Sequence, residues 1–173
     1  QSTSNGFVLP PAGGIIQTQY TQFTGTNSVT GTANTDMTLT DLTVNITPSS
    51  TSSIIKIEAM VNGEWSNQSA ATDSVWIFFR DNTALKGPAA GSRNVGIAMG
   101  TNITYEAGDQ SSTPERVYYS YFDTPSSTSQ ITYKVGFHSG YAYAWHLNKT
   151  VSDLDSVNYE RGISFISVTE IAG

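Results

Sequence analysis

A period-two alternation of apolar and polar residues is the feature that most restricts how this chain can fold. The alternation is clearest at residues 131–138, ITYKVGFH, where every second side chain is large and apolar. Residues 42–46 and 55–61 repeat the pattern. No window of 11 residues shows a helical period of 3.6. Alternation of this kind predicts β-strands with one buried face.

The remaining strands and turns follow from the same pattern. Further strands are expected at residues 16–22, 75–80, 94–99, 116–122, 141–147 and 162–171. Clusters of turn-forming residues separate them at 47–53, 67–73 and 124–130. Nine or ten short strands without an internal repeat predict an all-β fold, an antiparallel β-sandwich of the jelly-roll type. We expect this domain to span residues 14–173. Residues 1–13, which contain Pro10-Pro11, are expected to form an N-terminal arm or linker.

Composition excludes several functional classes. The net charge is −6, and the eight Lys and Arg residues are scattered, so no basic stripe is available to follow a nucleic-acid backbone. The chain has no cysteine, which excludes disulfides and thiolate chemistry. No apolar run reaches the ~18 residues that a membrane-spanning helix requires. Because residue 1 is Gln rather than Met, we expect a processed product or a fragment of a longer chain.

An uninterrupted apolar stretch stands out within the predicted sandwich. Five large apolar residues follow one another in SVWIFFR, residues 74–80. If every second residue from Val75 onward faces the interior, Trp76 and Phe78 point outward. A strand that is apolar on both faces needs two covers. A long loop lying over the strand is one possible second cover, and a second subunit is the other.

Two more segments carry apolar residues on both faces. In GISFISVTEIAG, residues 162–173, Phe165 lies on one face of the strand, whereas Ile166 and Val168 lie on the other. RVYYSYF, residues 116–122, has aromatic residues on both faces. Three such strands favour symmetric self-association, and we predict a homotrimer. The predicted interface residues are Trp76, Phe78, Ile166 and Val168.

Five segments, in order, resemble a module that recurs in bacteriophage virion proteins, especially the tail-fibre and structural proteins of marine phages. FFRDNTAL at 78–85 is similar to the strand–turn–strand element LxRDGTxI of that module, with Asn82 where Gly is usual. The other four are ITPSSTSSIIKIEAMV at 46–61, YSYFDTPSSTSQITYKV at 119–135, LNKTVSDLDSVNYERG at 147–162 and the terminal ISFISVTEIAG. The resemblance covers roughly residues 14–173. It implies a β-sandwich at the distal end of a trimeric fibre or on a capsid surface, without catalytic residues.

The Asp81-Asn82 pair is predicted to form a two-residue hairpin turn. The second position of such a turn requires a positive φ, which Asn tolerates better than most residues. We therefore expect the positive φ at Asn82.

Carbohydrate binding is the most specific ligand hypothesis. Sugar sites combine an exposed aromatic ring with amide or carboxylate hydrogen-bonding groups, and Trp65, Asn67 and Gln68 offer this combination at a predicted strand end. Tyr141, Tyr143 and Trp145 share a strand face in GYAYAWHL, residues 140–147. Their alternation with Ala favours a core role for that face.

The sequence gives little support for a metal site or a catalytic site. SDLDSVNYE, residues 152–160, offers oxygen ligands but lacks the EF-hand spacing, so a polar turn is the better interpretation. Nothing singles out a catalytic pair among the 14 acidic residues, and no GxSxG motif is present. We expect no enzymatic activity, no metal and no cofactor.

These observations lead to one functional expectation and one alternative. The expectation is a non-enzymatic bacteriophage protein at the virion surface, a tail-fibre tip or a capsid decoration. Its partners are sister subunits, other virion proteins and possible host-surface polysaccharides. The alternative is a secreted lectin-like carbohydrate-binding domain.

Overall fold

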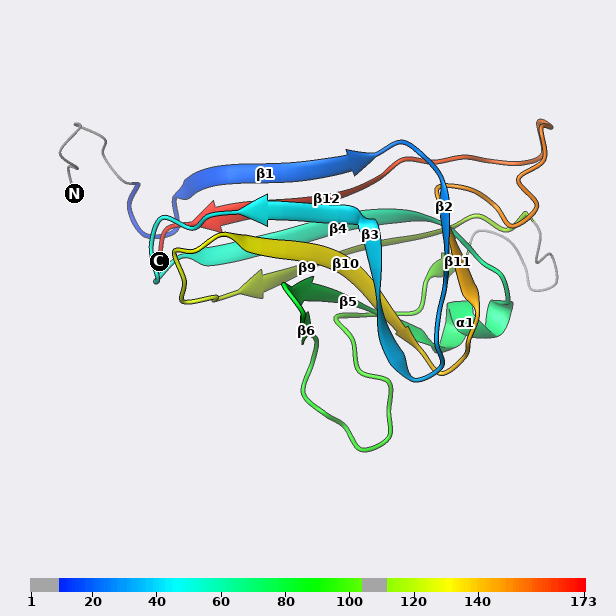
Figure 1. Cartoon of the computed structure of the whole chain (residues 1–173), viewed down its shortest axis with the longest axis horizontal. Helices are drawn as coiled ribbons and strands as arrows, with labels where there is room; N and C mark the ends of the chain where they lie inside the picture. The colour runs from blue at the N-terminus through cyan, green and yellow to red at the C-terminus, as the bar shows by residue number, and fades with distance from the viewer. Residues whose placement is uncertain (1–9, 104–111) are drawn as a thin grey trace.

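The computed structural model describes residues 10–103 and 112–173. This part of the chain forms strands and one short helix, α1 (Gln68–Asp73) (Figure 1). The strands are β1 (Ile15–Phe23), β2 (Asn27–Thr30), β3 (Thr35–Ile46), β4 (Ile54–Trp65), β5 (Ser74–Arg80), β6 (Thr83–Leu85), β7 (Ala98–Met99), β8 (Asn102–Ile103), β9 (Glu115–Asp123), β10 (Ile131–Ser139), β11 (Ala144–Leu147) and β12 (Ser164–Ile171).

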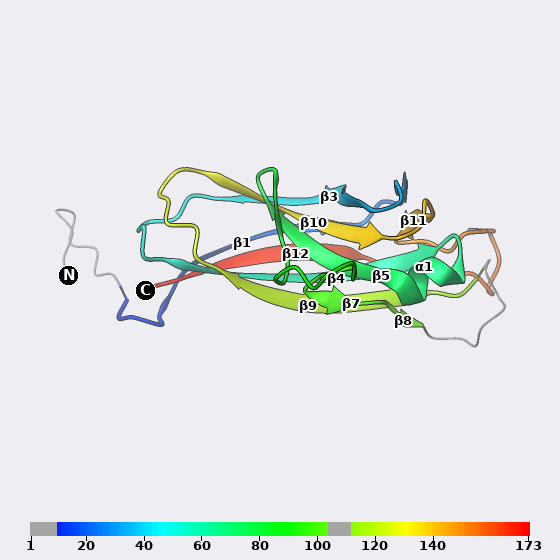
Figure 2. The same cartoon turned by 90° about the horizontal axis from the view of Figure 1, so that it is seen from below.

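Two antiparallel sheets pack face to face, as Figure 2 shows from the side. The larger sheet has the order β1-β12-β4-β11-β2, with β9 also paired to β4 and β8 paired to β9. The smaller sheet has the order β3-β10-β5-β6, with β7 also paired to β5. Without the short strands β2, β7, β8 and β11, the orders β1-β12-β4-β9 and β3-β10-β5-β6 are those of a jelly roll. The predicted all-β antiparallel sandwich of the jelly-roll type is therefore confirmed.

Aromatic rings fill the core at the end of the sandwich nearest α1. The ring of Trp76 lies 5.1 Å from that of Trp145 and 6.3 Å from that of Trp65, measured between centroids. Phe137 meets Trp65 edge-on at 4.9 Å. Tilted and edge-to-face contacts of this kind are the favoured geometry for aromatic pairs. The three tryptophans thus come together from β4, β5 and β11.

The outward orientation predicted for Trp76 and Phe78 is wrong. Both side chains are fully buried between the two sheets. The ring of Phe78 stacks on that of Tyr119 at a centroid distance of 4.4 Å. The orientation of β5 is therefore the reverse of the predicted one: Trp76 and Phe78 face the core. The alternate residues, Val75, Ile77 and Phe79, form the second face of the strand, which points away from the core.

That second face of β5 is also buried, and the subunit covers it with its own chain. A Cβ atom on Gly96, in the loop between β6 and β7, would lie 2.5 Å from Cβ of Val75. A Cβ atom on Gly136 of β10 would lie 2.5 Å from Cε2 of Phe79, so the absent side chain leaves room for the phenyl ring. The loop between β6 and β7, together with strand β10, thus covers the face of β5 for which a second subunit was predicted.

Ile166 and Val168 also point into the core and are fully buried. The other side of β12 carries Phe165, Ser167 and Thr169, which are half-buried. None of the four predicted interface residues is available to a second subunit. The predicted interface is wrong, whereas the homotrimer itself stays a prediction.

Three local predictions also need correction. Asp81 and Asn82 do form the two-residue turn between β5 and β6, but the positive φ of 54° belongs to Asp81. Its carboxylate oxygen Oδ1 accepts a 3.0 Å hydrogen bond from the backbone N–H of Thr132, which holds the turn against β10. Residues 67–73, predicted as a turn, contain α1. Of the strand predicted at residues 94–99, only β7 forms.

The two ends of the described chain meet at one tip of the sandwich. The N–H of Gly13 donates a 2.7 Å hydrogen bond to the carbonyl of Ala172, and the N–H of Ala172 donates one of 2.8 Å to the carbonyl of Gly14. Figure 1 places α1 and β11 at the opposite tip. Residues 1–9 of the predicted arm lie outside the described residues.

Candidate interaction surfaces

The residues predicted to bind sugar do not form a site. Trp65 is buried in the tryptophan cluster because β4 continues to Trp65 and pairs there with Trp145 of β11. Asn67 caps α1, with its side-chain oxygen accepting a 2.9 Å hydrogen bond from the N–H of Ser69. The side chain of Gln68 lies outside the described residues. The predicted aromatic platform at Trp65 is therefore wrong.

The aromatic segment before β11 divides into a buried part and an exposed part. Trp145 is fully buried, which confirms the core interpretation for that residue. Tyr141 is 42% exposed. Its ring stacks on that of Tyr143 at a centroid distance of 5.6 Å and an interplanar angle of 29°. The stack fixes an exposed aromatic ring at the tip that carries α1.

Tyr141 lines an open pocket of about 520 Å³. The pocket lies where the end of α1, the start of β5, the loop before β7 and the turn after β10 meet. Its functional side chains are Asp73, Ser74, Arg93, Asn94, Met99 and Tyr141, and we call it the Tyr141 pocket. The sequence did not reveal this pocket as a whole, because its residues come from three segments that are distant in sequence.

The solvent side of the larger sheet forms a second surface. Antiparallel register aligns Phe165 of β12 with Met60 of β4 and with Tyr118 of β9. The same alternation assigns one solvent-facing set of side chains to β1, β12, β4 and β9. This set, the outer sheet face, consists of Thr18, Tyr20, Gln22, Phe165, Ser167, Thr169, Lys56, Glu58, Met60, Arg116, Tyr118, Ser120 and Phe122.

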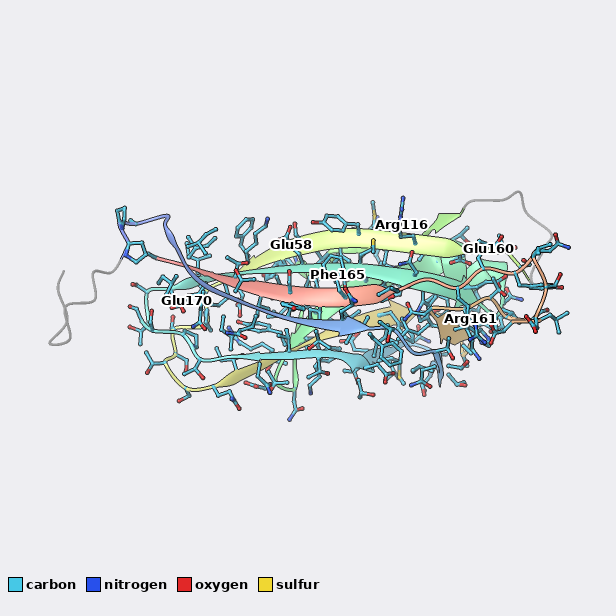
Figure 3. The ribbon with its side chains drawn as sticks, turned by 90° about the horizontal axis from the view of Figure 1, so that it is seen from above. Glu58, Arg116, Glu160, Arg161, Phe165 and Glu170 are labelled. Atoms are coloured by element: carbon cyan, nitrogen blue, oxygen red, sulfur yellow. The ribbon has the colours of Figure 1, made fainter. Side chains whose placement is uncertain are left out.

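The outer sheet face combines large exposed rings with few charges. Tyr20, Tyr118 and Phe122 are 72%, 59% and 58% exposed. In Figure 3 the labelled Glu58, Arg116 and Phe165 lie along the neighbouring strands β4, β9 and β12. Several large exposed rings on one sheet face indicate an interaction surface more strongly than an isolated exposed ring does.

Glu58 organises the polar contacts of the outer sheet face. Its Oε1 lies 2.9 Å from Nζ of Lys56 and accepts a 2.8 Å hydrogen bond from the hydroxyl of Tyr118. The contact with Lys56 is the main cause of the lowered pKa of the Glu58 carboxyl. Hydrogen bonding to Glu58 in turn raises the pKa of the Tyr118 hydroxyl. The phenol ring of Tyr118 is thereby held in place on the sheet.

Two buried carboxylates, Glu64 and Glu115, accept hydrogen bonds where the end of β4 pairs with the start of β9. Oε1 of Glu64 accepts a 3.0 Å hydrogen bond from the N–H of Thr113. Oε2 of Glu115 accepts a 2.6 Å hydrogen bond from the hydroxyl of Thr101. Burial raises the pKa of Glu115 to about 7, and the nearby Glu64 charge adds to the increase. Glu115 lines a pocket of about 170 Å³, below the usual size of a small-molecule site.

The acidic segment at residues 152–160 forms an ion pair. Nε of Arg161 lies 2.8 Å from Oδ1 of Asp153, and Nη2 of Arg161 donates a 2.9 Å hydrogen bond to Oδ2. This bidentate contact is the main cause of the lowered pKa of Asp153. Within residues 10–103 and 112–173, no three His, Asp or Glu side chains gather in an arrangement suited to a metal ion.

Among the described residues, no helix has the length and apolar character to cross a membrane.

Comparison with known proteins identifies no relative of this chain. A scan against models of known protein families found no match, and a search of curated proteins found none either.

Proposed function

We propose that this chain is a non-enzymatic structural module of a bacteriophage virion surface, a tail-fibre tip or a capsid decoration. In this proposal it assembles as a homotrimer through the outer sheet face and presents its loops to host-surface glycans. The ordered resemblance of five segments to phage virion modules supports this assignment. The jelly-roll fold is in keeping with it, since viral capsid proteins and lectins use the fold, but a fold alone does not define a function.

The exposed rings of the outer sheet face carry the proposal. The solvent side of an antiparallel sheet is ordinarily polar. Here Tyr20, Tyr118 and Phe122 are each more than half exposed. Their burial against a sister subunit removes apolar surface from water, which stabilises an assembly by about 25 cal/mol per Å².

Charge opposes self-association less at the outer sheet face than over the rest of the molecule. Lys56, Glu58 and Arg116 give this face a net charge of +1, whereas the whole chain carries −6. The rest of the molecule therefore carries −7 (−6 minus +1). Subunits that meet through their outer sheet faces around a rotation axis keep their most negative surfaces apart.

The four strands alone supply more than half of the area that a stable interface needs. Four strands spaced by about 4.8 Å, each contributing about 8 residues of 3.4 Å, span roughly 500 Å². A stable interface buries about 800 Å² per partner. Ile15 and Ile163, which are also exposed, lie at the ends of strands of the same sheet and extend the apolar area. In such a trimer, simultaneous binding through three linked sites raises the overall affinity for a multivalent glycan by about 10²–10⁴ over that of a single site.

Light scattering coupled to size exclusion tests the assembly. A trimer has a mass of about 56 kDa, three times 18.6 kDa. The Tyr118→Asp/Phe122→Asp double variant replaces the two exposed rings of β9 by charges, so we expect a folded monomer. Leu154→Asp, at an equally exposed apolar residue outside the face, is the matched control and should stay trimeric. A monomeric wild-type chain at all concentrations would refute the trimer.

The Tyr141 pocket favours the second candidate function, a secreted lectin-like domain. Such a domain needs a sugar site but no assembly face. A wild-type monomer that binds sugars at the Tyr141 pocket would support the lectin and contradict the fibre-tip module.

A further inference from the structure

We infer that the Tyr141 pocket binds one neutral pyranose unit of a glycan. The inference rests on the glycan-recognition part of the proposed function and assigns that recognition to particular residues. It does not depend on the outer sheet face, which lies on the larger sheet.

Backbone and side-chain hydrogen bonds hold the pocket in shape. Nδ2 of Asn94 donates a 3.1 Å hydrogen bond to the carbonyl of Asp73, which ties the loop before β7 to the end of α1. The N–H of Gly100 donates one of 2.8 Å to the carbonyl of Ser74. On the opposite wall, the N–H of Tyr141 donates one of 3.1 Å to Oγ of Ser139. A pocket of this size with preformed walls is the usual form of a small-molecule site.

Tyr141 and Met99 supply the apolar part of the site. One face of the Tyr141 ring is stacked against Tyr143, which fixes the ring and leaves its remaining surface to solvent. Met99 is 91% exposed, and its thioether is a flexible apolar contact. The C–H groups on one face of a pyranose pack well against an aromatic ring of fixed orientation. The exposed ring and the thioether therefore match the apolar face of a sugar.

Ser74 is a residue of the pocket lining whose hydroxyl has no hydrogen-bond partner within the described part of the chain. Its side chain is 2% exposed, and its hydroxyl finds no hydrogen-bond partner among the described residues. Five buried side-chain polar atoms share this condition, and three of them are tryptophan N–H groups in the core. Ser74 is the one of these five residues that lines the Tyr141 pocket. An unpaired buried hydroxyl destabilises the folded chain, and a ligand hydroxyl within reach would remove that penalty.

The charged groups on the rim select a neutral ligand. Asp73 and Arg93 both line the pocket, and no ion pair within the described residues uses either of them. Their opposite charges give the pocket lining no net charge, so the site as a whole attracts neither anions nor cations over a long range. A polyhydroxylated ring can donate to the Asp73 carboxylate and accept from the Arg93 guanidinium. A neutral sugar uses both groups at once.

Titration of the full chain with methyl glycosides of glucose, galactose, mannose and N-acetylglucosamine tests the inference, with amide chemical shifts as the readout. We expect saturable shifts at Ser74, Asn94 and Tyr141 for at least one glycoside. The Tyr141→Ala variant should bind that glycoside about tenfold more weakly. Tyr118→Ala, at an exposed tyrosine of the outer sheet face, should bind like the wild type. Absence of pocket shifts with all four glycosides would overturn the inference.

The Ser74→Ala variant separates ligand binding from a structural role. Removal of an unpaired hydroxyl should leave the thermal stability unchanged or increase it. The same change should weaken glycoside binding about fivefold, the loss of one net hydrogen bond. Ser120→Ala, at an exposed serine of the outer sheet face, is the matched control and should change neither quantity. Lower stability with unchanged affinity would contradict the assignment.

Light scattering on the same samples distinguishes this inference from the proposed assembly. An intact trimer that binds no glycoside would overturn the pocket assignment alone. A monomer that binds a glycoside at Tyr141 would overturn the trimer and the fibre-tip module, but not the pocket assignment.

Discussion

The hydroxyl of Tyr133 donates a 2.7 Å hydrogen bond to Oδ2 of Asp123 and so joins the two sheets through their side chains. Tyr133 lies on β10 of the smaller sheet, and Asp123 ends β9 of the larger one. Nη1 of Arg80, from β5, lies 3.0 and 3.1 Å from the two carboxylate oxygens of the same aspartate. One nearly buried carboxylate therefore receives donors from two strands of the opposite sheet.

The Asp123→Ala variant should lose about 3 kcal/mol of unfolding free energy, because it leaves a buried phenol and a partly buried guanidinium without their acceptor. Urea denaturation measures the loss. Asp155→Ala, at an exposed aspartate outside this network, should change stability by no more than about 0.5 kcal/mol. Equal losses in the two variants would show that the contact between the sheets contributes nothing.

Phe78→Ala should destabilise the subunit without changing its assembly. The ring of Phe78 is fully buried and stacks on Tyr119, so truncation leaves a cavity between the sheets. Replacement of a buried Phe by Ala costs about 3–5 kcal/mol. Chemical denaturation tests the stability, and light scattering on the folded fraction tests the mass. A stable variant with a lower oligomeric mass would instead restore Phe78 to an interface.

Glu115 should make the protein less stable as the pH rises. Burial raises the pKa of this carboxyl to about 7, from an ordinary value near 4.5. Its stabilising contribution is therefore complete below pH 4.5 and is lost as the pH rises through 7. Glu115→Gln stays neutral and can still accept a hydrogen bond from the N–H of Trp65. Between pH 4 and pH 8, thermal or urea unfolding should show the variant gaining about 3 kcal/mol relative to the wild type. A difference that does not change with pH would contradict this assignment.

Glu170 should have the opposite pH dependence. This carboxylate is fully buried, which opposes its ionisation, yet hydrogen bonds from Ser53, Gln17 and Ser49 outweigh burial and lower its pKa. Its contribution is present above the ordinary carboxyl pKa and is lost as the pH falls through the lowered value. Glu170→Gln should therefore be less stable than the wild type at pH 7. The deficit, followed by urea unfolding, should shrink as the wild-type Glu170 carboxyl is protonated in acid. A deficit that persists unchanged at low pH would assign it to packing instead.

The sequence predicted the sandwich well because an alternation of apolar and polar residues directly indicates strands with one buried and one solvent-exposed face. The segment 131–138 alternates without a break, and it forms β10. Residues 74–80 lack this information, since an apolar residue stands at every position from Val75 to Phe79. No polar residue marks the solvent side, so the parity of the strand depends on Gly96 and Gly136, which are distant in sequence.

The candidate surfaces were harder to predict for the same reason. Trp65 was expected at an exposed strand end, but pairing with β11 carries β4 into the core. Ser74 and Asn94 lie 20 positions apart and become neighbours only through the fold. GYAYAWHL did contain a signal, because its aromatic alternation extends beyond the residues that β11 buries.

The meeting of both ends of the described chain at one tip has a practical consequence for measurement. Gly13 and Ala172 are hydrogen-bonded to each other, while the Tyr141 pocket lies with α1 at the other tip. A tag attached after Gly173 would anchor every molecule on a sensor chip in a common orientation, with the pocket directed into the flowing analyte and the tether well away from it.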